Sequence, residues 1–154
     1  SGDTVALLDL DHFKQINDTL GHEVGDQVLA AFGRHLRAGV RDRDMIGRLG
    51  GEEFVVMFPN TEVAEAVAVL QRLQRTWPAS APQAITFSAG VAAASSDASA
   101  SEAAGRTCLR RADALMYVAK RSGRDKVVSE ADLPEQIDLT DHATSVVPEV
   151  PRIG

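Results

Sequence analysis

Short apolar runs recur along the chain and predict the strands of a sheet. Residues 4–10 and 85–91 are runs of the kind expected for buried strands. Two further runs, 45–49 and 54–59, flank a Gly-Gly-Glu-Glu turn, and this arrangement predicts a β-hairpin. Residues 126–128 suit a short edge strand. We therefore expect five strands, with one tight hairpin near the centre of the chain.

Apolar residues at helical spacing predict two helices after the first strand. The first is expected to begin after Asp11, whose side chain suits a helix N-cap, and to end at Leu20 because Gly21 stops it. The second is expected to span residues 23–38.

The clearest helical pattern covers residues 62–77. Its spacing places Trp77 in the core, and Pro78 is expected to begin the loop that follows. Residues 92–100 are rich in Ala and Ser and predict a loop. Ser99 and Glu102 match a capping box for a last helix, which Gly123 would end. This helix is expected to turn Leu109, Ala112, Leu115, Met116 and Ala119 inward.

The order of these elements predicts an α/β sandwich. A mixed, mainly antiparallel five-stranded sheet would be flanked by helices in one domain, residues 1–128. From residue 129 onward, prolines and acidic residues are interspersed with few large apolar side chains, so 129–154 is expected to be a disordered acidic tail.

Composition narrows the class of protein. The 154 residues suffice for one domain with a proper core, and the net charge of -6 argues against a general nucleic-acid surface. A nucleotide substrate stays open, because local cations and metal ions can offset that charge. The single cysteine, Cys108, excludes an internal disulfide and is expected in the core. No run is apolar enough to span a membrane, and we expect a cytoplasmic domain without membrane contact.

Two acidic motifs are the first candidates for chemistry. Asp9 and Asp11 follow the first strand, while Glu52 and Glu53 occupy the hairpin tip. If the two strands are sheet neighbours, these carboxylates converge on one edge, and such oxygen ligands suit Mg²⁺ or Mn²⁺. The hairpin pair taken alone is more typical of a solvated acidic turn than of a functional site. Asp11 has two open interpretations, a helix N-cap and a catalytic carboxylate.

The start of the first helix is a candidate anion site. The free backbone N–H groups of His12, Phe13 and Lys14 and the helix dipole favour negative charge there, and Lys14 adds a cation. At the hairpin tip, Gly50 and Gly51 let the phosphates or backbone of another molecule approach closely.

Five separated motifs occur over roughly residues 4–128. They are Asp9-Leu10-Asp11-His12-Phe13-Lys14-Gln15-Ile16-Asn17-Asp18, Gly21-His22-Glu23-Val24-Gly25-Asp26, Gly50-Gly51-Glu52-Glu53-Phe54, Ser88-Ala89-Gly90-Val91, and Ala112-Asp113-Ala114-Leu115-Met116-Tyr117-Val118-Ala119-Lys120 with Gly123-Arg124. Together they resemble the GGDEF domain of diguanylate cyclases. The resemblance implies the palm-like fold that GGDEF domains share with nucleotide cyclases.

The resemblance implies two divalent ions in each active site, Mg²⁺ or Mn²⁺. Asp9, the backbone carbonyl of Leu10 and Glu52 match the family's metal ligands. Glu53 matches its other essential carboxylate, either a metal ligand or a base for the attacking hydroxyl.

Further matches imply how GTP is bound. Lys120 and Arg124 match triphosphate ligands, although cations at the end of a helix also have a purely structural explanation. Asn17 and Asp26 match the guanine contacts, and a carboxylate can accept from the guanine N–H groups. The alternative for Asp26 is that it caps the second helix.

The implied reaction condenses two GTP molecules into cyclic di-GMP and two pyrophosphates in a homodimer, where two domains face each other. Arg41 and Asp44 match the family's inhibitory product site by their spacing from Gly50, although a short Arg/Asp run is ordinarily a solvated turn. Two alternatives are a sensor that binds GTP or cyclic di-GMP without turnover and a dimerisation module. Family members normally carry a helix and a turn before the first strand, so we expect this chain to be much less active than a longer parent.

Overall fold

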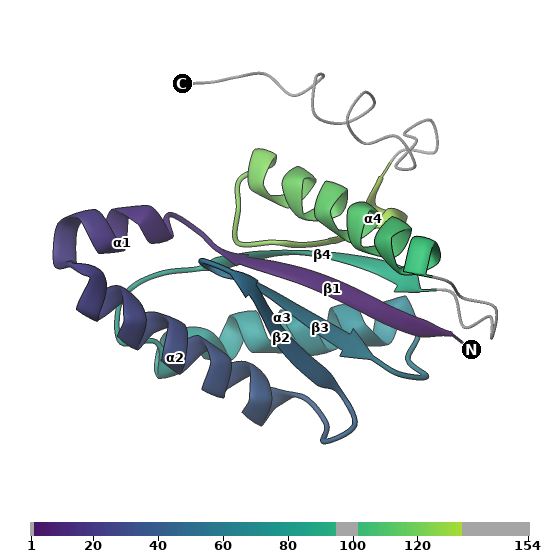
Figure 1. Ribbon diagram of the computed structural model, residues 1–154, viewed down its shortest axis with the longest axis horizontal. Helices are drawn as coiled ribbons and strands as arrows, with labels where there is room; N and C mark the ends of the chain where they lie inside the picture. The colour runs from purple at the N-terminus through teal and green to yellow at the C-terminus, as the bar shows by residue number, and fades with distance from the viewer. Residues whose placement is uncertain (1, 95–101, 134–154) are drawn as a thin grey trace.

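The computed structural model describes residues 2–94 and 102–133. Five strands form one sheet in the order β2-β3-β1-β4-β5, with the first strand at its centre (Figure 1). The sheet is antiparallel except for the β4–β5 pair, which is parallel. The strands are β1 (Asp3–Leu10), β2 (Met45–Gly50), β3 (Glu53–Phe58), β4 (Phe87–Ala94) and β5 (Val127–Ser129). The predicted mixed, mainly antiparallel five-stranded sheet is confirmed.

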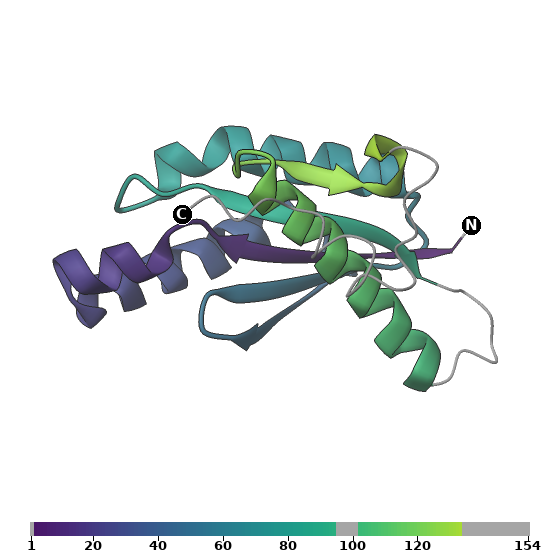
Figure 2. The ribbon, with the colours of Figure 1, turned by 90° about the horizontal axis from the view of Figure 1, so that it is seen from above.

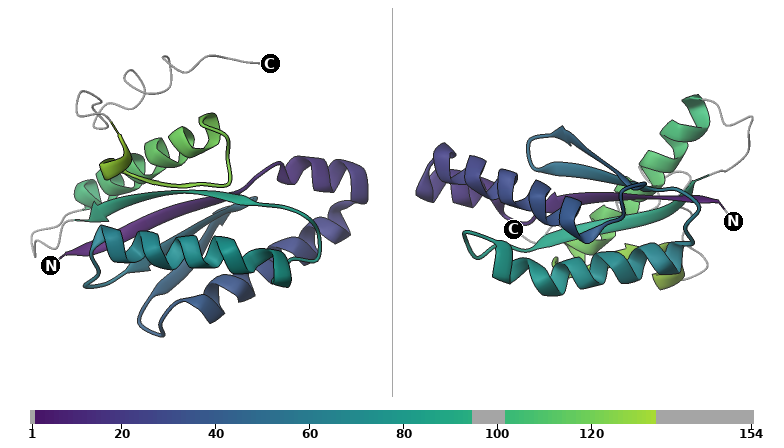
Figure 3. Two further views of the ribbon diagram at one scale, coloured as in Figure 1. Left: turned by 180° about the vertical axis from the view of Figure 1, so that it is seen from behind. Right: turned by 90° about the horizontal axis from the view of Figure 1, so that it is seen from below.

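Helices cover both faces of this sheet. Two long helices, α2 and α3, lie on one face, and α4 lies on the other (Figures 2 and 3). The helical elements are α1 (Phe13–Leu20), α2 (His22–Gly39), α3 (Val63–Ser80), α4 (Glu102–Arg121) and the short 3₁₀ helix η1 (Glu130–Asp132). In the described part of the chain, no helix has the length and hydropathy needed to cross a bilayer.

The core has two parts, one on each face of the sheet, and alternate side chains of the central strand β1 belong to one or the other. Side chains of successive strand residues point to opposite faces. Ala6, Leu8 and Leu10 belong to the core under α2 and α3, whereas Val5 and Leu7 belong to the core under α4. By the same alternation, Asp9 lies on the α4 side of the sheet. Its carboxylate is therefore within reach of α4 and not of α2 or α3.

An aromatic cluster fills the larger core. The ring centroid of Phe32 lies 5.1 Å from those of Phe54, Trp77 and Phe87. Trp77 is 1% exposed, which confirms its predicted place in the core. Cys108 is also buried, as predicted, although it lies in the smaller core under α4.

Gly90 brings α4 close to the sheet. A Cβ atom at this position would lie 2.1 Å from the carbonyl oxygen of Ala112 and 2.2 Å from the amide nitrogen of Met116. Any larger residue would push α4 away from β4. The Ser-Ala-Gly-Val motif therefore has a packing reason for its glycine.

Three predicted boundaries differ from the structure. The helix expected to end at Trp77 continues through Pro78 to Ser80, so the proline disturbs the last turn without ending the helix. The strand predicted at 85–91 lies two residues later at its start and three at its end. β5 includes Ser129 and η1 follows it, so the predicted tail begins too early. The predicted capping box of Ser99 and the tail beyond Leu133 lie outside the described residues.

The face under α4 is incompletely covered along β2. Met45 and Leu49 are more than half exposed, and they line an apolar groove of about 500 Å³ between β2 and α4. Leu109, predicted to point inward, lies at the rim of this groove and is 37% exposed. That prediction was wrong, because Leu109 lines the open groove, whereas the four other predicted inward residues of α4 are buried.

Candidate active site

The pairing of β1 with β3 brings the two acidic motifs together. In the β1–β3 pairing, Asp9 and Glu53 are direct partners, and the Leu10 amide donates a hydrogen bond of 3.3 Å to the Glu52 carbonyl oxygen. The strands that end in the two acidic motifs are thus neighbours, as expected. Asp9 is buried at 6% exposure, and both glutamates are partly exposed. We call this group of three carboxylates, Asp9, Glu52 and Glu53, the acidic edge.

Lys120 reaches the acidic edge from α4. Its Nζ lies 3.0 Å from Asp9 Oδ1 and 4.0 Å from Asp11 Oδ1. The first contact is an ion pair without hydrogen-bond direction, since Asp9 Oδ1 is buried and receives no hydrogen bond from the described residues. Lys120 is therefore a member of the site, beyond any structural role at the end of its helix. Arg124 follows in the exposed turn after α4.

Two carboxyl groups of the acidic edge, those of Asp9 and Glu53, have pKa values raised above the ordinary value. Burial raises the pKa of Asp9, and the neighbouring Glu52 and Asp11 add to this, while Lys120 opposes it. Burial also raises the pKa of Glu53, followed by repulsion from Asp9 and then Asp113. A cation of high charge would relieve both effects.

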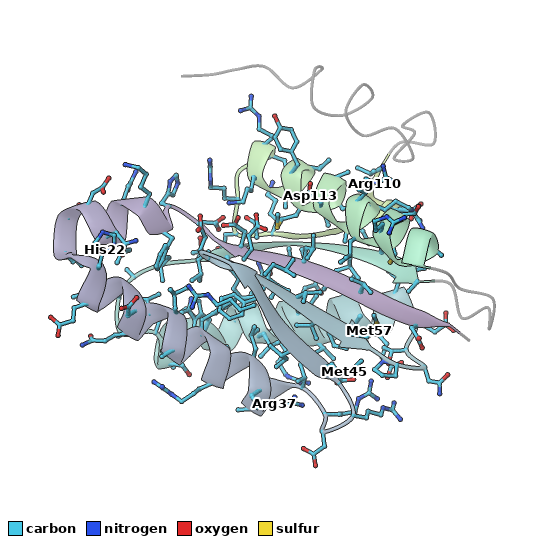
Figure 4. The ribbon with its side chains drawn as sticks, in the orientation of Figure 1. His22, Arg37, Met45, Met57, Arg110 and Asp113 are labelled. Atoms are coloured by element: carbon cyan, nitrogen blue, oxygen red, sulfur yellow. The ribbon has the colours of Figure 1, made fainter. Side chains whose placement is uncertain are left out.

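Asp113 was assigned no role from the sequence. It lies on α4, on the side of the sheet that carries Lys120 (Figure 4), and its charge acts on Glu53. Asp113 and Lys120 are seven residues apart, which is two helical turns, so they share one face of α4. That spacing was the signal that could have found it.

The acidic edge fits a divalent cation by its donor chemistry. Carboxylate oxygens of Asp9, Glu52 and Glu53 and the carbonyl of Leu10 are the hard ligands that Mg²⁺ and Mn²⁺ prefer. Asp9 Oδ1 is buried and receives no hydrogen bond from the described residues, and among these residues its charge is offset by Lys120 alone, so a cation would be a favourable further partner. Among residues 2–94 and 102–133, however, no three acidic, histidine or cysteine side chains already stand in a cation-binding cluster. Some of the ligands would have to come from the substrate and from backbone carbonyls.

The turn between β1 and α1 differs from the prediction. His12, with a left-handed φ of 57°, is the N-cap of α1 and makes no side-chain capping bond. Asp11 instead accepts hydrogen bonds from Thr86, Ser88 and the backbone of Asp125. The N-cap interpretation of Asp11 was therefore wrong, because a tertiary set of donors holds its carboxylate away from the helix start.

The start of α1 remains uncapped by any acidic side chain. Phe13 is buried and supplies only its backbone to the surface, while the Lys14 side chain is exposed and pairs with Asp18 at 2.7 Å. That partner raises the pKa of Lys14, so the cation is retained. The predicted role of His12, Phe13 and Lys14 as an anion site stays a prediction.

The two predicted guanine contacts lie on neighbouring helices. Asn17 Oδ1 on α1 is buried without a hydrogen-bond partner among the described residues. Gly25 makes room for it, since a Cβ there would lie 1.9 Å from Asn17 Oδ1. Asp26 follows on α2 with an exposed side chain. The cap alternative for Asp26 was wrong, because α2 begins at His22 with Gly21 as its N-cap.

The hairpin tip is open to solvent, and a side-chain hydrogen bond holds its backbone in place. Cβ atoms at Gly50 and Gly51 would meet no atom within 4 Å, and Gly51 has a left-handed φ of 46°. Arg48 Nε donates a hydrogen bond of 2.8 Å to the Gly51 carbonyl oxygen. The sequence pattern gave this arginine no role, and its position two residues before Gly50 was the only signal.

Arg41 and Asp44 form a closed turn at the other end of β2. The Arg41 amide donates to Asp44 Oδ2 at 2.8 Å, and the Asp44 amide donates to the Arg41 carbonyl at 2.9 Å. The Arg41 guanidinium also donates to Thr61 at 2.8 Å and lies 3.6 Å from Glu65. Asp44 is 2% exposed, whereas the Arg41 side chain is 42% exposed.

Comparison with known proteins decides the family. Residues 3–126 match the family described as diguanylate cyclase, GGDEF domain. The chain belongs to this family. It is 41% identical over 141 residues to the response regulator PleD of Caulobacter vibrioides, covering 84% of this chain and 30% of that protein. It is 42% identical over 129 residues to the diguanylate cyclase DgcP of Pseudomonas aeruginosa, covering 80% and 18% respectively. The GGDEF chain thus spans less than a third of the length of either relative.

Solved structures confirm the GGDEF fold. The coiled coil and GGDEF domain of DgcB from Caulobacter crescentus, in complex with c-di-GMP, aligns with a TM-score of 0.74 at 30% identity, covering 84% of this chain and 70% of that one. The active GGEEF domain of a diguanylate cyclase from Vibrio cholerae aligns with a TM-score of 0.73 at 30% identity, covering 84% and 83%.

Proposed function

We propose that this GGDEF domain condenses two molecules of GTP into cyclic di-GMP and releases two pyrophosphates. The observation that carries the proposal is the pairing of Asp9 with Glu53 at the acidic edge. These carboxylates gather like charges at a partly buried site, leave one oxygen unsatisfied, and lie beside a lysine. Such an arrangement costs stability and suits a polyanionic substrate that arrives with divalent cations.

Asp9, Glu52 and the Leu10 carbonyl would hold Mg²⁺ or Mn²⁺, two ions in each site. Bound there, the cations would stabilise the charge on the α-phosphate and on the attacking 3′-oxygen. Glu53 has two candidate roles, as a further ligand and as the acceptor of the 3′-hydroxyl proton. Its raised pKa makes its carboxylate a better proton acceptor than an exposed glutamate.

Cations and backbone donors around the acidic edge would bind the triphosphate. Lys120 would exchange its contact with Asp9 for a phosphate oxygen, and Arg124 would join it from the turn after α4. The N–H groups of His12, Phe13 and Lys14 would face the phosphates from the uncapped start of α1. Gly50 and Gly51 leave the opposite side of the site open.

Asn17 and Asp26 would select guanine. The N1–H and N2–H₂ groups of guanine are donors, and the unpaired Asn17 Oδ1 and the Asp26 carboxylate are acceptors. Adenine presents an acceptor at N1, which would face these oxygens without a hydrogen bond. We therefore expect GTP to be preferred over ATP.

The product would form between two copies of the domain, each carrying one GTP. A homodimer is thus part of the proposal. Arg41 and Asp44 would bind cyclic di-GMP as an inhibitory product. For this, Arg41 must leave Thr61 and Glu65, which is feasible because its side chain is 42% exposed.

The test is to incubate the chain with GTP and Mg²⁺ and to quantify cyclic di-GMP and pyrophosphate by chromatography. The same assay is run on the chain fused at its N-terminus to a parallel dimeric coiled coil, which enforces the pairing of two domains. We expect one cyclic dinucleotide for two pyrophosphates, no product from ATP, and faster turnover in the fusion. GTP binding without product in both forms would instead establish a sensor.

A further inference from the structure

We infer that Asp11 is a positioning residue that holds the turn after α4, and with it Lys120 and Arg124, in place beside the acidic edge. This inference rests on the proposed function, since it concerns how the same site is held for its nucleotide. It assigns Asp11 neither to the metal ligands nor to the helix cap.

Asp11 is buried and both oxygens of its carboxylate accept hydrogen bonds. At 2% exposure, its two oxygens accept hydrogen bonds from Thr86 Oγ1 at 2.7 Å, Ser88 Oγ at 2.8 Å and the Asp125 amide at 3.1 Å. Its own amide donates to the Thr86 carbonyl at 2.8 Å. A carboxylate with this many donors has no reason to move and little capacity for another ligand.

The turn that Asp11 holds has an unfavourable backbone. Gly123, Arg124 and Asp125 have φ values of 119°, 63° and 51° in succession. Left-handed conformations are costly for a residue such as arginine and less so for aspartate. Hydrogen bonds on both sides over-determine the turn, because the Arg124 amide donates to the Ala119 carbonyl at 2.9 Å and the Asp125 amide donates to Asp11.

The position of Asp11 in the chain gives this contact a consequence for the site. Asp11 lies two residues beyond Asp9, and Lys120 Nζ lies 3.0 Å from Asp9 and 4.0 Å from Asp11. One side chain therefore ties the end of β1 to the turn that carries Arg124. Without it the turn can relax, and Arg124 and Lys120 lose their fixed distance from the carboxylates of the acidic edge.

Two substitutions at Asp11 distinguish the effect of its hydrogen bonds from the effect of its negative charge. Asp11→Asn loses the charge, but its amide oxygen can still accept from the Asp125 amide while its NH₂ group donates to the Ser88 hydroxyl. Asp11→Ala loses every acceptor. Thr86→Val is the matched control, because it removes one donor to Asp11 and leaves the Asp125 contact intact.

The experiment makes three measurements on the full chain, for the wild type and for each of these three variants. Hydrogen exchange measures protection of the Asp125 amide. Calorimetry with Mg²⁺ measures the Kd of α,β-methylene-GTP, which cannot undergo the cleavage that condensation requires. Turnover with GTP measures kcat and KM.

We expect the Asp125 amide to be protected in the wild type, Asp11→Asn and Thr86→Val, and to exchange rapidly in Asp11→Ala. The Kd of the analogue should rise about tenfold in Asp11→Ala and stay within about threefold in the other two. KM should follow Kd. If Asp11→Ala does not fold, protection and affinity in Asp11→Asn decide the question.

A rapidly exchanging Asp125 amide in the wild type would overturn the inference, as would wild-type affinity in a folded Asp11→Ala. Weak binding by Asp11→Asn with its Asp125 amide still protected would overturn it in favour of charge. A wild type that binds the analogue but makes no cyclic di-GMP refutes the proposed function alone. If the wild type does not bind the analogue, both proposals fail.

Discussion

Two charged clusters stand at opposite ends of β2, and they are built in opposite ways. In the Arg41–Asp44 turn, opposite charges lie close together. The Arg41 amide donates to the Asp44 carboxylate at 2.8 Å, and the Asp44 amide donates to the Arg41 carbonyl at 2.9 Å. At the acidic edge, like charges gather, and the pKa values of Asp9 and Glu53 are raised. The turn closes on its own hydrogen bonds, although Asp44 Oδ1 is buried without a hydrogen-bond partner among the described residues. Within the described part of the chain, the edge has only Lys120 as a cation beside its carboxylates, and a divalent cation would stabilise it further.

Because of this difference, the acidic edge indicates a ligand site more strongly than the Arg41–Asp44 turn does. An Arg/Asp turn closed by its own hydrogen bonds and ion pair would persist for structural reasons alone. Buried or partly buried carboxylates whose pKa values are raised by burial and by acidic neighbours have no such structural reason. The acidic edge therefore points to chemistry, and the turn points to a ligand only if Arg41 can leave its present partners.

The largest expected effect tests the acidic edge. Asp9→Asn and Glu53→Gln should each lower cyclic di-GMP synthesis by at least about a hundredfold, because each removes a charged oxygen from the reacting centre. The measurement is the initial rate in the coiled-coil fusion, with the exposed Glu62→Gln as control. Rates near wild type in either variant would reduce the edge to a solvated acidic turn.

A residue outside both clusters gives the next largest effect. Asp26→Ala should weaken binding of α,β-methylene-GTP about ten- to a hundredfold, since a hydrogen bond to a charged acceptor is lost. Calorimetry measures this affinity, with Glu23→Gln on the same helix as control. An unchanged Kd would remove Asp26 from the guanine site.

The Arg41–Asp44 turn is tested by product inhibition. Arg41→Ala should raise the inhibition constant of cyclic di-GMP about tenfold or more and leave the initial rate unchanged, because the turn lies at the far end of β2 from the edge. Glu65→Gln is a sharper companion, since it releases Arg41 from one present partner and should preserve inhibition. Equal inhibition of Arg41→Ala and wild type would make the motif a structural turn only.

Stability should respond with opposite signs in the two clusters. Asp44→Ala should lower the free energy of unfolding by about 1–3 kcal/mol, because the Arg41 amide loses its acceptor. Glu53→Gln should raise it in the absence of nucleotide and metal. Thermal and urea unfolding at neutral pH measure both changes, and a destabilised Glu53→Gln would contradict the account.

The pH dependence of this gain follows from the sign of the shift. The pKa of Glu53 is higher in the folded than in the unfolded state, so the folded state binds the proton more tightly. The cost is therefore fully present at neutral pH, shrinks as the pH falls through the raised pKa, and is gone below the pKa of the unfolded state. The stability gap between Glu53→Gln and wild type should close in acid. A gap that widens in acid would contradict burial and repulsion as its cause.

The sequence predicted most of the fold because the spacing of apolar residues differs between strands and helices. It predicted that Asp9 and the hairpin glutamates would converge if their strands were neighbours, and the register shows that the strands are neighbours. It failed where distant segments meet. Asp11 looked like a helix cap because Thr86 and Ser88, its actual donors, are more than seventy positions away. Asp113 had no assigned role because only the packing of α4 against the sheet brings its charge near Glu53.

The most direct test of the central claim is the binding of Mn²⁺ to the acidic edge. Electron paramagnetic resonance counts free Mn²⁺ during titration of the chain loaded with α,β-methylene-GTP, with the nucleotide alone as reference. The account predicts two Mn²⁺ ions per nucleotide-loaded chain, and binding at least about tenfold weaker in Asp9→Asn. Equal stoichiometry and affinity in wild type and Asp9→Asn would contradict it.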